Sequence, residues 1–304
     1  MSKIAIISDI HANMHALDLI FDDISKRSVE KIVCLGDIVT KYLHPDDVIK
    51  EVKNNCTIVI KGNCDDLVAK NPNYRYVRGL IGIDGIDYLD NLPISEQIEV
   101  NKTILNFFHS NPKDLESIFN PLFNDNEHTS AKDRTIKTED YNQMFTSNDP
   151  QINFVGHTHN NYIAIEENKN LSIINEIPKE KQIDGISKEI IIPNDKRAII
   201  NVGSAGEHAH LKKNENDHYD TYIDPFLTYA IVDTNDLNKS IKVQIIKVPY
   251  KQKLVDVFYD FKKIQKDGGL KNAKLPMQPG DTRKIYNSLI DMGYNDDEIG
   301  GMKI

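Results

Sequence analysis

The sequence predicts an α/β fold built around a parallel sheet. Three short apolar runs, at residues 3–8, 31–35 and 57–61, are separated by helical patterns at 14–26 and 45–53. Apolar strands joined by connections of helix length pair as parallel neighbours that are buried on both faces. A chain of 304 residues with 39% hydrophobic and 27% charged residues can bury such a core, and this composition excludes a disordered chain or a small disulfide scaffold.

Further strands are predicted in the middle of the chain. Asn101 and Lys102 make a two-residue turn between strands at 96–100 and 103–109. Later strands are expected at 151–155, 162–166, 171–175, 198–202, 227–233 and 241–248. The last two form a hairpin that a helix at 251–265 follows. We expect the pairings in this part of the chain to be antiparallel.

The chain divides into a main domain at 1–267 and a C-terminal helical extension at 268–304. Residues 112–150 interrupt the succession of strands with polar stretches and a short helical pattern near 141–145, so we interpret them as an inserted, lid-like segment. The extension carries Gly, Pro and Asp residues and then a helical pattern at 282–292. Such a helix either covers apolar surface or binds a protein partner.

The charge and the cysteine content limit the classes of function that the sequence supports. With 46 acidic and 37 basic residues the net charge is −9, which argues against non-specific nucleic-acid binding. Cys34, Cys56 and Cys64 cannot all pair, and we expect reduced thiols. The apolar run at 4–7 is too short for a signal peptide or a membrane span. We therefore expect a cytoplasmic protein that does not contact a membrane.

Polar side chains that can bind metals follow the predicted strands. They are Asp9, His11, Asp37, Asn63, His109, His157 and His159. The carboxyl ends of strands form the ligand crevice in open α/β sheets, so these side chains are expected at one edge. Carboxylate, imidazole and amide ligands suit Mn²⁺, Fe or Zn²⁺, and seven of them match two ions that share one ligand. Two such ions activate a water and stabilise both oxygens of an in-line phosphoryl transfer.

The motifs around these residues resemble the calcineurin-like metallophosphoesterases, and specifically their small bacterial branch of predicted phosphodiesterases. They occur in family order and are SDIH at 8–11, LGDIV at 35–39, KGNCD at 61–65, FFHS at 107–110, VGHTH at 155–159 and NVGS at 201–204. The resemblance extends to about residue 265. It implies a four-layer α/β/β/α sandwich of two mixed sheets and a phosphoric ester hydrolase that needs divalent metal.

The resemblance also assigns the ligands. One ion is held by Asp9, His11, Asp37 and His159, and the other by Asp37, Asn63, His109 and His157. Asp37 would bridge the two ions, which are most typically Mn²⁺ or Fe, with Zn²⁺ and Ni²⁺ as alternatives. A hydroxide that bridges the ions would attack the phosphorus.

The chain departs from the commoner family pattern at Cys64, where a His usually donates a proton to the leaving group. The following Asp65 matches the Asp that supports this His. A thiol is a poorer acid catalyst than an imidazolium at neutral pH, so a poor leaving group would lose roughly 10²–10⁴ in rate. Diester and aryl substrates would suffer less. We therefore place Asp37, Asn63, Cys64 and Asp65 in the catalytic set.

Substrate contacts are expected from Asn63 and from Arg75 and Arg78, whose guanidinium groups can clamp a phosphate. His208 and His210 form a second H-x-H pair and are read either as a polar loop or as a substrate or accessory ion contact. His128, in the inserted segment, is an alternative proton donor.

The predicted function is thus hydrolysis of a phosphate ester, more typically a phosphodiester or a nucleotide-type substrate. The alternatives are a protein or small-molecule phosphomonoesterase, a nuclease, and a metal-poor scaffold of the same fold that binds proteins. The complete ligand set argues against the scaffold, and the net charge of −9 argues against the nuclease.

Overall fold

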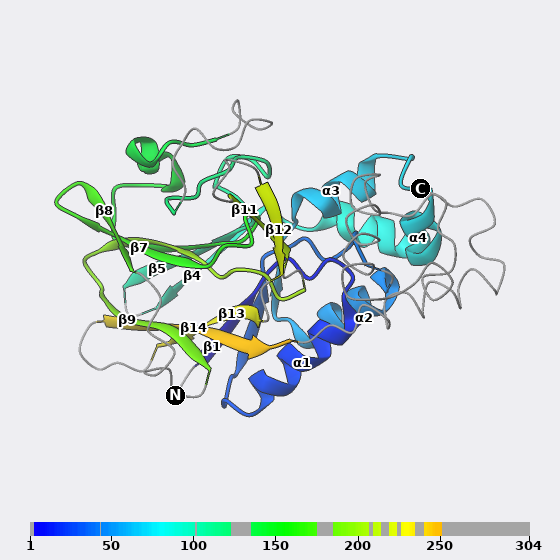
Figure 1. Cartoon of the computed structure of the whole chain (residues 1–304), viewed down its shortest axis with the longest axis horizontal. Coiled ribbons are helices and arrows are strands. Elements are labelled where there is room, and N and C mark those ends of the chain that lie inside the picture. The colour runs from blue at the N-terminus through cyan, green and yellow to red at the C-terminus, as the bar shows by residue number, and fades with distance from the viewer. Residues whose placement is uncertain are drawn as a thin grey trace.

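The computed structural model describes residues 3–42, 44–100, 102–122, 135–174, 185–206, 209–213, 219–223, 226–234 and 240–250. These residues form two six-stranded mixed sheets and a separate two-stranded ribbon (Figure 1). The predicted α/β sandwich of two mixed sheets is confirmed. Among the described residues, no helix combines the length and the hydropathy that crossing a membrane requires.

The first sheet contains the predicted parallel strands. Its order is β3-β2-β1-β13-β14-β9. The strands are β1 (Lys3–Ile7), β2 (Lys31–Cys34), β3 (Ile58–Val59), β9 (Ile186–Pro193), β13 (Phe226–Asp233) and β14 (Ser240–Pro249). β1, β2 and β3 pair in parallel, and the remaining pairings are antiparallel. The three parallel strands therefore end at the same edge of the sheet.

Helices α1 (Met14–Ser25) and α2 (Pro45–Asn55) connect these strands. α1 begins where the side-chain oxygen of Asn13 accepts a hydrogen bond from the Ala16 amide at 3.1 Å, which satisfies one of the free donors of the first turn. α2 begins at Pro45, where the missing amide hydrogen costs no helical bond. Both helices bury an apolar stripe and leave a charged face in solvent.

The second sheet has the order β4-β5-β6-β10-β7-β8. Its strands are β4 (Ser95–Val100), β5 (Thr103–Phe108), β6 (Gln151–Val155), β7 (Tyr162–Glu167), β8 (Asn170–Ile174) and β10 (Arg197–Asn201). The pairs β4–β5, β7–β8 and β7–β10 are antiparallel as expected. The expectation was wrong for β6, which runs parallel to both β5 and β10. Long connections bring the chain back to the same edge before each of these parallel pairings.

Two apolar cores hold the layers together. Ile6, Phe107 and Phe154 belong to the core between the two sheets. Ile7 and Leu17 belong to the core between the first sheet and its helices. Successive residues of β1 thus point into different cores, which is the burial on both faces that its unbroken apolar run predicts.

The described part of the segment 112–150 contributes to the core. A 3-10 helix, η2 (Thr138–Met144), lies where the short helical pattern is found, and Tyr141, Met144 and Phe145 are buried. The amide nitrogen of the Asn153 side chain donates to the Met144 carbonyl at 2.8 Å, which ties the segment to β6. The described part of the segment therefore packs against the second sheet.

Several elements differ from the sequence prediction. Helices α3 (Asn63–Lys70) and α4 (Arg75–Asn91) and strand β9 were not predicted, because their apolar residues do not follow a clear helical or strand period. Strands β11 (Ala209–Lys213) and β12 (Tyr219–Ile223) pair where a polar loop was one reading. The helix predicted at 251–265 and the extension at 268–304 lie outside the described residues.

Candidate metal centre

The seven predicted ligands lie together where the two sheets meet. They follow the carboxyl ends of five strands: Asp9 and His11 after β1, Asp37 after β2, Asn63 after β3 at the first position of α3, His109 after β5, and His157 and His159 after β6. Strand ends of both sheets therefore converge on one site, as the position of the motifs predicts.

The backbone at this site is bent into an uncommon conformation. Asp9, His11, Asp37, His157 and His159 have φ values between 51° and 64°. Side chains with a Cβ seldom adopt this left-handed region, which costs about 1–3 kcal/mol per residue. Hydrogen bonds between loops hold it, because the Asp9 amide donates to the carbonyl of Gly36 at 3.0 Å and the His11 amide to that of Asp37 at 2.9 Å. The surrounding fold thus fixes the direction of these side chains.

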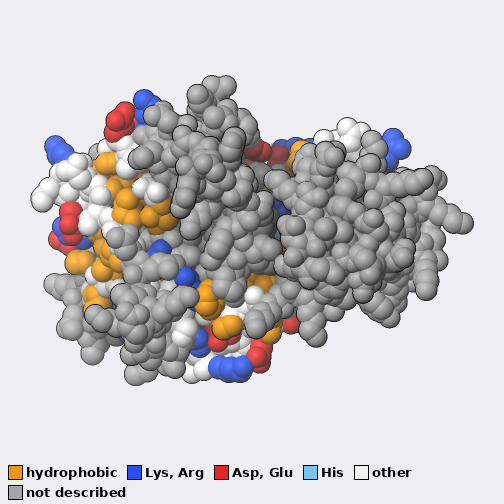
Figure 2. Space-filling model, in the orientation of Figure 1, with side chains coloured by type: hydrophobic (Ala, Val, Ile, Leu, Met, Phe, Trp, Pro, Cys, Tyr) orange, Lys and Arg blue, Asp and Glu red, His pale blue; other side chains and the backbone are white. Residues whose placement is uncertain are grey.

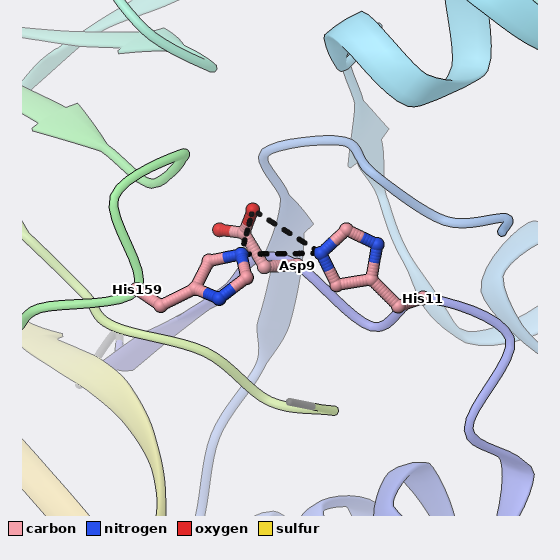
Figure 3. Close-up of side chains that lie close together, drawn as sticks. All are labelled: Asp9, His11 and His159. Atoms are coloured by element: carbon pink, nitrogen blue, oxygen red, sulfur yellow. Dashed lines mark hydrogen bonds and ion pairs between the residues drawn. The ribbon is translucent and has the colours of Figure 1, made fainter. Parts of the chain in front are cut away.

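One group of ligands consists of Asp9, His11 and His159 (Figure 3). Nε2 of His159 lies 3.2 Å from Oδ1 of Asp9 and 3.1 Å from Nε2 of His11. Nε2 of His11 lies 3.9 Å from the same Asp9 oxygen. The His159 side chain keeps 12% of its surface exposed while the other two are buried, so the group meets solvent on the His159 side.

A second group forms around Asn63. Its Oδ1 atom lies 3.0 Å from Nε2 of His109 and 3.0 Å from Nδ1 of His157. Asp37 lies between the two groups, because its Oδ1 is 3.5 Å from Nε2 of His109 and its Oδ2 is 3.8 Å from Nε2 of His11. The single carboxylate of Asp37 is therefore placed where it could act as a ligand in both groups.

The imidazoles are oriented by neighbouring groups. Nδ1 of His109 donates to the Leu35 carbonyl at 2.9 Å, which leaves the lone pair of Nε2 directed at the site. Nδ1 of His11 lies 3.4 Å from the hydroxyl of Thr40, a residue that the sequence analysis did not select. Its position three residues after Asp37 was the available signal. Such contacts fix the ring nitrogen that is free to bind a metal.

Asp65 ties the loop after β2 to the start of α3. Its Oδ1 accepts hydrogen bonds from the amides of Ile38 at 2.9 Å and Val39 at 3.2 Å, and its Oδ2 accepts one from Gly62 at 2.9 Å. Burial and the charge of Asp37 raise the pKa of Asp65 to about 7. Its contacts are to backbone amides, so it positions the ligand loops where the family pattern has it supporting a His.

Cys64 lies beside the bridging carboxylate. Its amide donates to Oδ1 of Asp37 at 2.8 Å, and its sulfur lies 3.8 Å from the side-chain nitrogen of Asn63. Burial and then the charge of Asp37 raise the pKa of the thiol well above its ordinary value. The thiol is therefore protonated at neutral pH.

Burial and mutual charge set the protonation states of the ligands. Burial alone would raise the pKa of Asp9, but the imidazoles of His159, His109 and His11 outweigh it and hold that pKa below its ordinary value. Burial and the neighbouring His109 lower the pKa of His157 to about 4. At neutral pH Asp9 is ionised and His157 is neutral, which are the forms that bind metal ions.

The residues present fit divalent cations. Oδ1 of Asp9 is buried and accepts no hydrogen bond, although imidazole nitrogens of His159, His11 and His109 lie 3.2 to 4.0 Å away. An ionised oxygen that accepts no hydrogen bond is costly to bury, and a shared cation removes that cost. Carboxylate, imidazole and amide donors are those that Mn²⁺, Fe and Zn²⁺ accept.

No contact with this centre is seen for the other predicted residues that the structure describes. The prediction that Arg78 clamps phosphate is not supported, because its Nη1 donates to the carbonyls of Val68 and Ala69 at 2.6 Å each and caps the end of α3. Arg75 is exposed at the first position of α4. His128 and His208 lie outside the described residues, and of His210 only its strand, β11, is described.

Comparisons with known proteins agree with this geometry. The sequence model of the calcineurin-like phosphoesterase family matches residues 2–183, which is more than half of the chain. An uncharacterized protein of Methanocaldococcus jannaschii is 31% identical over 265 residues, covering 82% of this chain and 88% of that protein.

Solved structures share the fold. A metallophosphoesterase from Sphaerobacter thermophilus superposes with a TM-score of 0.60 at 22% identity, covering 94% of this chain and 98% of that one. A hypothetical protein from Pyrococcus horikoshii gives a TM-score of 0.55 at 18% identity, covering 89% of this chain and 95% of that one. With the matching family model and the relative at 31% identity, the chain belongs to the calcineurin-like phosphoesterase family of metal-dependent phosphoester hydrolases.

Proposed function

We propose that the chain holds two divalent ions and hydrolyses a phosphodiester or a nucleotide-type phosphate ester. Asp9, His11, Asp37 and His159 would hold one ion, and Asp37, Asn63, His109 and His157 the other. The observation that carries the proposal is the position of Asp37, whose two oxygens face the two groups at 3.5 and 3.8 Å. Two bound ions supply an activated water and stabilise the attacking and leaving oxygens of phosphoryl transfer. We expect Mn²⁺ or Fe, with Zn²⁺ or Ni²⁺ as alternatives.

Hydrogen bonds from neighbouring residues fix the positions of the proposed ligands. The Cys64 amide fixes one oxygen of Asp37, and the Leu35 carbonyl fixes the tautomer of His109. Asp65 keeps the loop that bears Asp37 against the one that bears Asn63. Such preorganisation is what lets a site favour the transition state over the bound substrate. We also propose residues 1–267 as the catalytic domain and 268–304 as an extension.

The preference for diesters rests on the group at position 64. A protonated thiol with a raised pKa is a weak acid and gives little help to a leaving group that needs a proton. Diesters with acidic leaving groups depend least on that help. Asn63 would bind the phosphate, and the exposed Arg75 is a second candidate contact.

A small substrate also agrees with the surface. On the face shown in Figure 2, Lys and Arg side chains of the described residues lie among Asp and Glu side chains. The net charge of −9 favours a nucleotide-sized ester over a long polyanion.

The proposal is tested with bis-p-nitrophenyl phosphate and p-nitrophenyl phosphate, each with Mn²⁺ and with a chelator, for the natural chain and Cys64→His. We expect Mn²⁺-dependent diesterase activity to exceed monoesterase activity, and the variant to gain monoesterase activity because an imidazolium can protonate the leaving group. If neither substrate turns over with Mn²⁺, Fe²⁺ or Zn²⁺ and elemental analysis finds no metal, the proposed centre is wrong.

A further inference from the structure

We infer that Cys64 supplies a sulfur ligand to the metal centre when a thiophilic divalent ion binds there. The inference rests on the proposed metal centre and adds to it a basis for choosing between metals. Cys64 offers its sulfur, His11 a ring nitrogen and Asp37 a carboxylate oxygen, and these three atoms all lie within 4.8 Å of one another. His11 and Asp37 are two of the proposed ligands of one ion.

The spacing suits a single ion. Ligand atoms bound at about 2.0–2.3 Å on the same ion cannot be more than roughly 4.6 Å apart, so a small inward movement brings the three atoms into coordination distance. The side chains of His11 and Asp37 are only 1% and 4% exposed. Oδ1 of Asp9, another proposed ligand of that ion, lies 3.9 Å from Nε2 of His11. The sulfur would therefore add a donor beside His11 and Asp37.

The donor chemistry discriminates between ions. Thiolate sulfur favours soft or borderline ions such as Cd²⁺ and Zn²⁺, whereas Mn²⁺ is served by oxygen and imidazole ligands. When a sulfur–metal bond replaces the S–H bond, the proton passes to the buffer. A thiophilic ion would thus gain a ligand that Mn²⁺ does not use. The other cysteines, Cys34 and Cys56, belong to no such group among the described residues.

The test uses the full chain, freed of metal with a chelator and titrated with Cd²⁺ alone. The readout is the ultraviolet charge-transfer absorption from sulfur to cadmium, compared in the natural chain, Cys64→Ser and the matched control Cys56→Ser. We expect the band in the natural chain and the control, and its loss in Cys64→Ser. Affinity for Cd²⁺ should fall in Cys64→Ser, while affinity for Mn²⁺ should change much less, because Mn²⁺ does not favour sulfur ligands.

Two results would overturn this inference alone. One is a charge-transfer band that persists in Cys64→Ser. The other is a natural chain that binds two Mn²⁺ ions but shows no band with bound Cd²⁺, which leaves the proposed function intact. A chain that binds neither ion removes both proposals. If Cys64→Ser does not fold, cadmium NMR of the natural chain decides, because sulfur coordination shifts the resonance strongly from its position with oxygen and nitrogen ligands.

Discussion

Gly62 is the position at which the smallest change should disturb the centre most. A Cβ atom there would lie 2.1 Å from both the amide nitrogen and Oδ1 of Asp37, whereas ordinary van der Waals contact begins at 3.4 Å. Gly62→Ala therefore forces Asp37 or its loop to move by about 1.3 Å. The backbone of Gly62, at φ −93° and ψ 170°, is open to any residue, so steric displacement is the only perturbation.

The displacement acts on the carboxylate that faces both ligand groups. A shift of about 1 Å at a catalytic group can cost on the order of 10²-fold in rate, and the overpacking should destabilise the fold by about 1–3 kcal/mol. The measurements are Mn²⁺ stoichiometry, hydrolysis of bis-p-nitrophenyl phosphate and thermal unfolding.

The matched control is Gly79→Ala in α4. A Cβ there meets no atom within 4 Å. This variant should keep its activity and gain up to about 0.5–1 kcal/mol, because Ala is favoured over Gly inside a helix. If Gly62→Ala binds two ions and turns over within about twofold of the natural chain, the steric argument and the role given to Asp37 both fail.

Three further predictions follow from single contacts. Asp37→Asn should abolish turnover and weaken both metal sites, and retention of full activity would remove Asp37 from the bridging position. Asp65→Ala leaves three buried amides without an acceptor, so the free energy of unfolding should fall by about 1–3 kcal/mol, and an unchanged denaturant midpoint would contradict this. In Glu166, hydrogen bonds from Arg197 at 2.6 and 2.7 Å hold the carboxyl pKa below its ordinary value. The stability that this ion pair adds to the fold is fully present above the unfolded pKa of about 4.3, and it is lost as the pH falls through the lowered pKa. Glu166→Gln should therefore lower the free energy of unfolding of the metal-free chain by about 1–2 kcal/mol at pH 7. This difference between the variant and the natural chain should disappear in acid. A difference that stays constant with pH would exclude the ion pair as its source.

The strands at the core of the fold could be predicted because their signal is local. The unbroken apolar run at 3–8 shows directly that β1 is buried on both faces, and Ile6 and Ile7 do enter different cores. Helix α4 gave no such signal, since its exposed positions include Ile83 and Leu80 and its apolar residues do not gather on one face. The parallel pairing of β6 with β10 is a property of distant segments, which no local pattern encodes.

The candidate ligands could be predicted for a different reason. Each ligand follows the carboxyl end of a strand, and residues that follow such strand ends lie close together at one edge of the sheet. The same logic fails for Arg78, because the residue type indicates that it can bind phosphate but not that the end of α3 already accepts its hydrogen bonds. Thr40 and the backbone contacts of Asp65 depend on side-chain direction, which spacing in the sequence does not determine.

The glycines that precede three ligands show why the motifs extend beyond the metal-binding residues. A Cβ atom added at Gly36 would lie 2.2 Å from the amide nitrogen of Gly62, and one added at Gly62 would lie 2.1 Å from the amide nitrogen of Asp37. A Cβ atom added at Gly156 would lie 2.4 Å from Oδ2 of Asp9. The loops that bear Asp37 and Asn63 are therefore packed backbone to backbone, and the backbone at Gly156 packs against the side chains of Ser8 and Asp9, with no room for a side chain at any of the three glycines. Protein interiors are packed so closely that they transmit a displacement instead of absorbing it. The spacing of the two ligand groups therefore depends on these glycine contacts as much as on the ligands themselves.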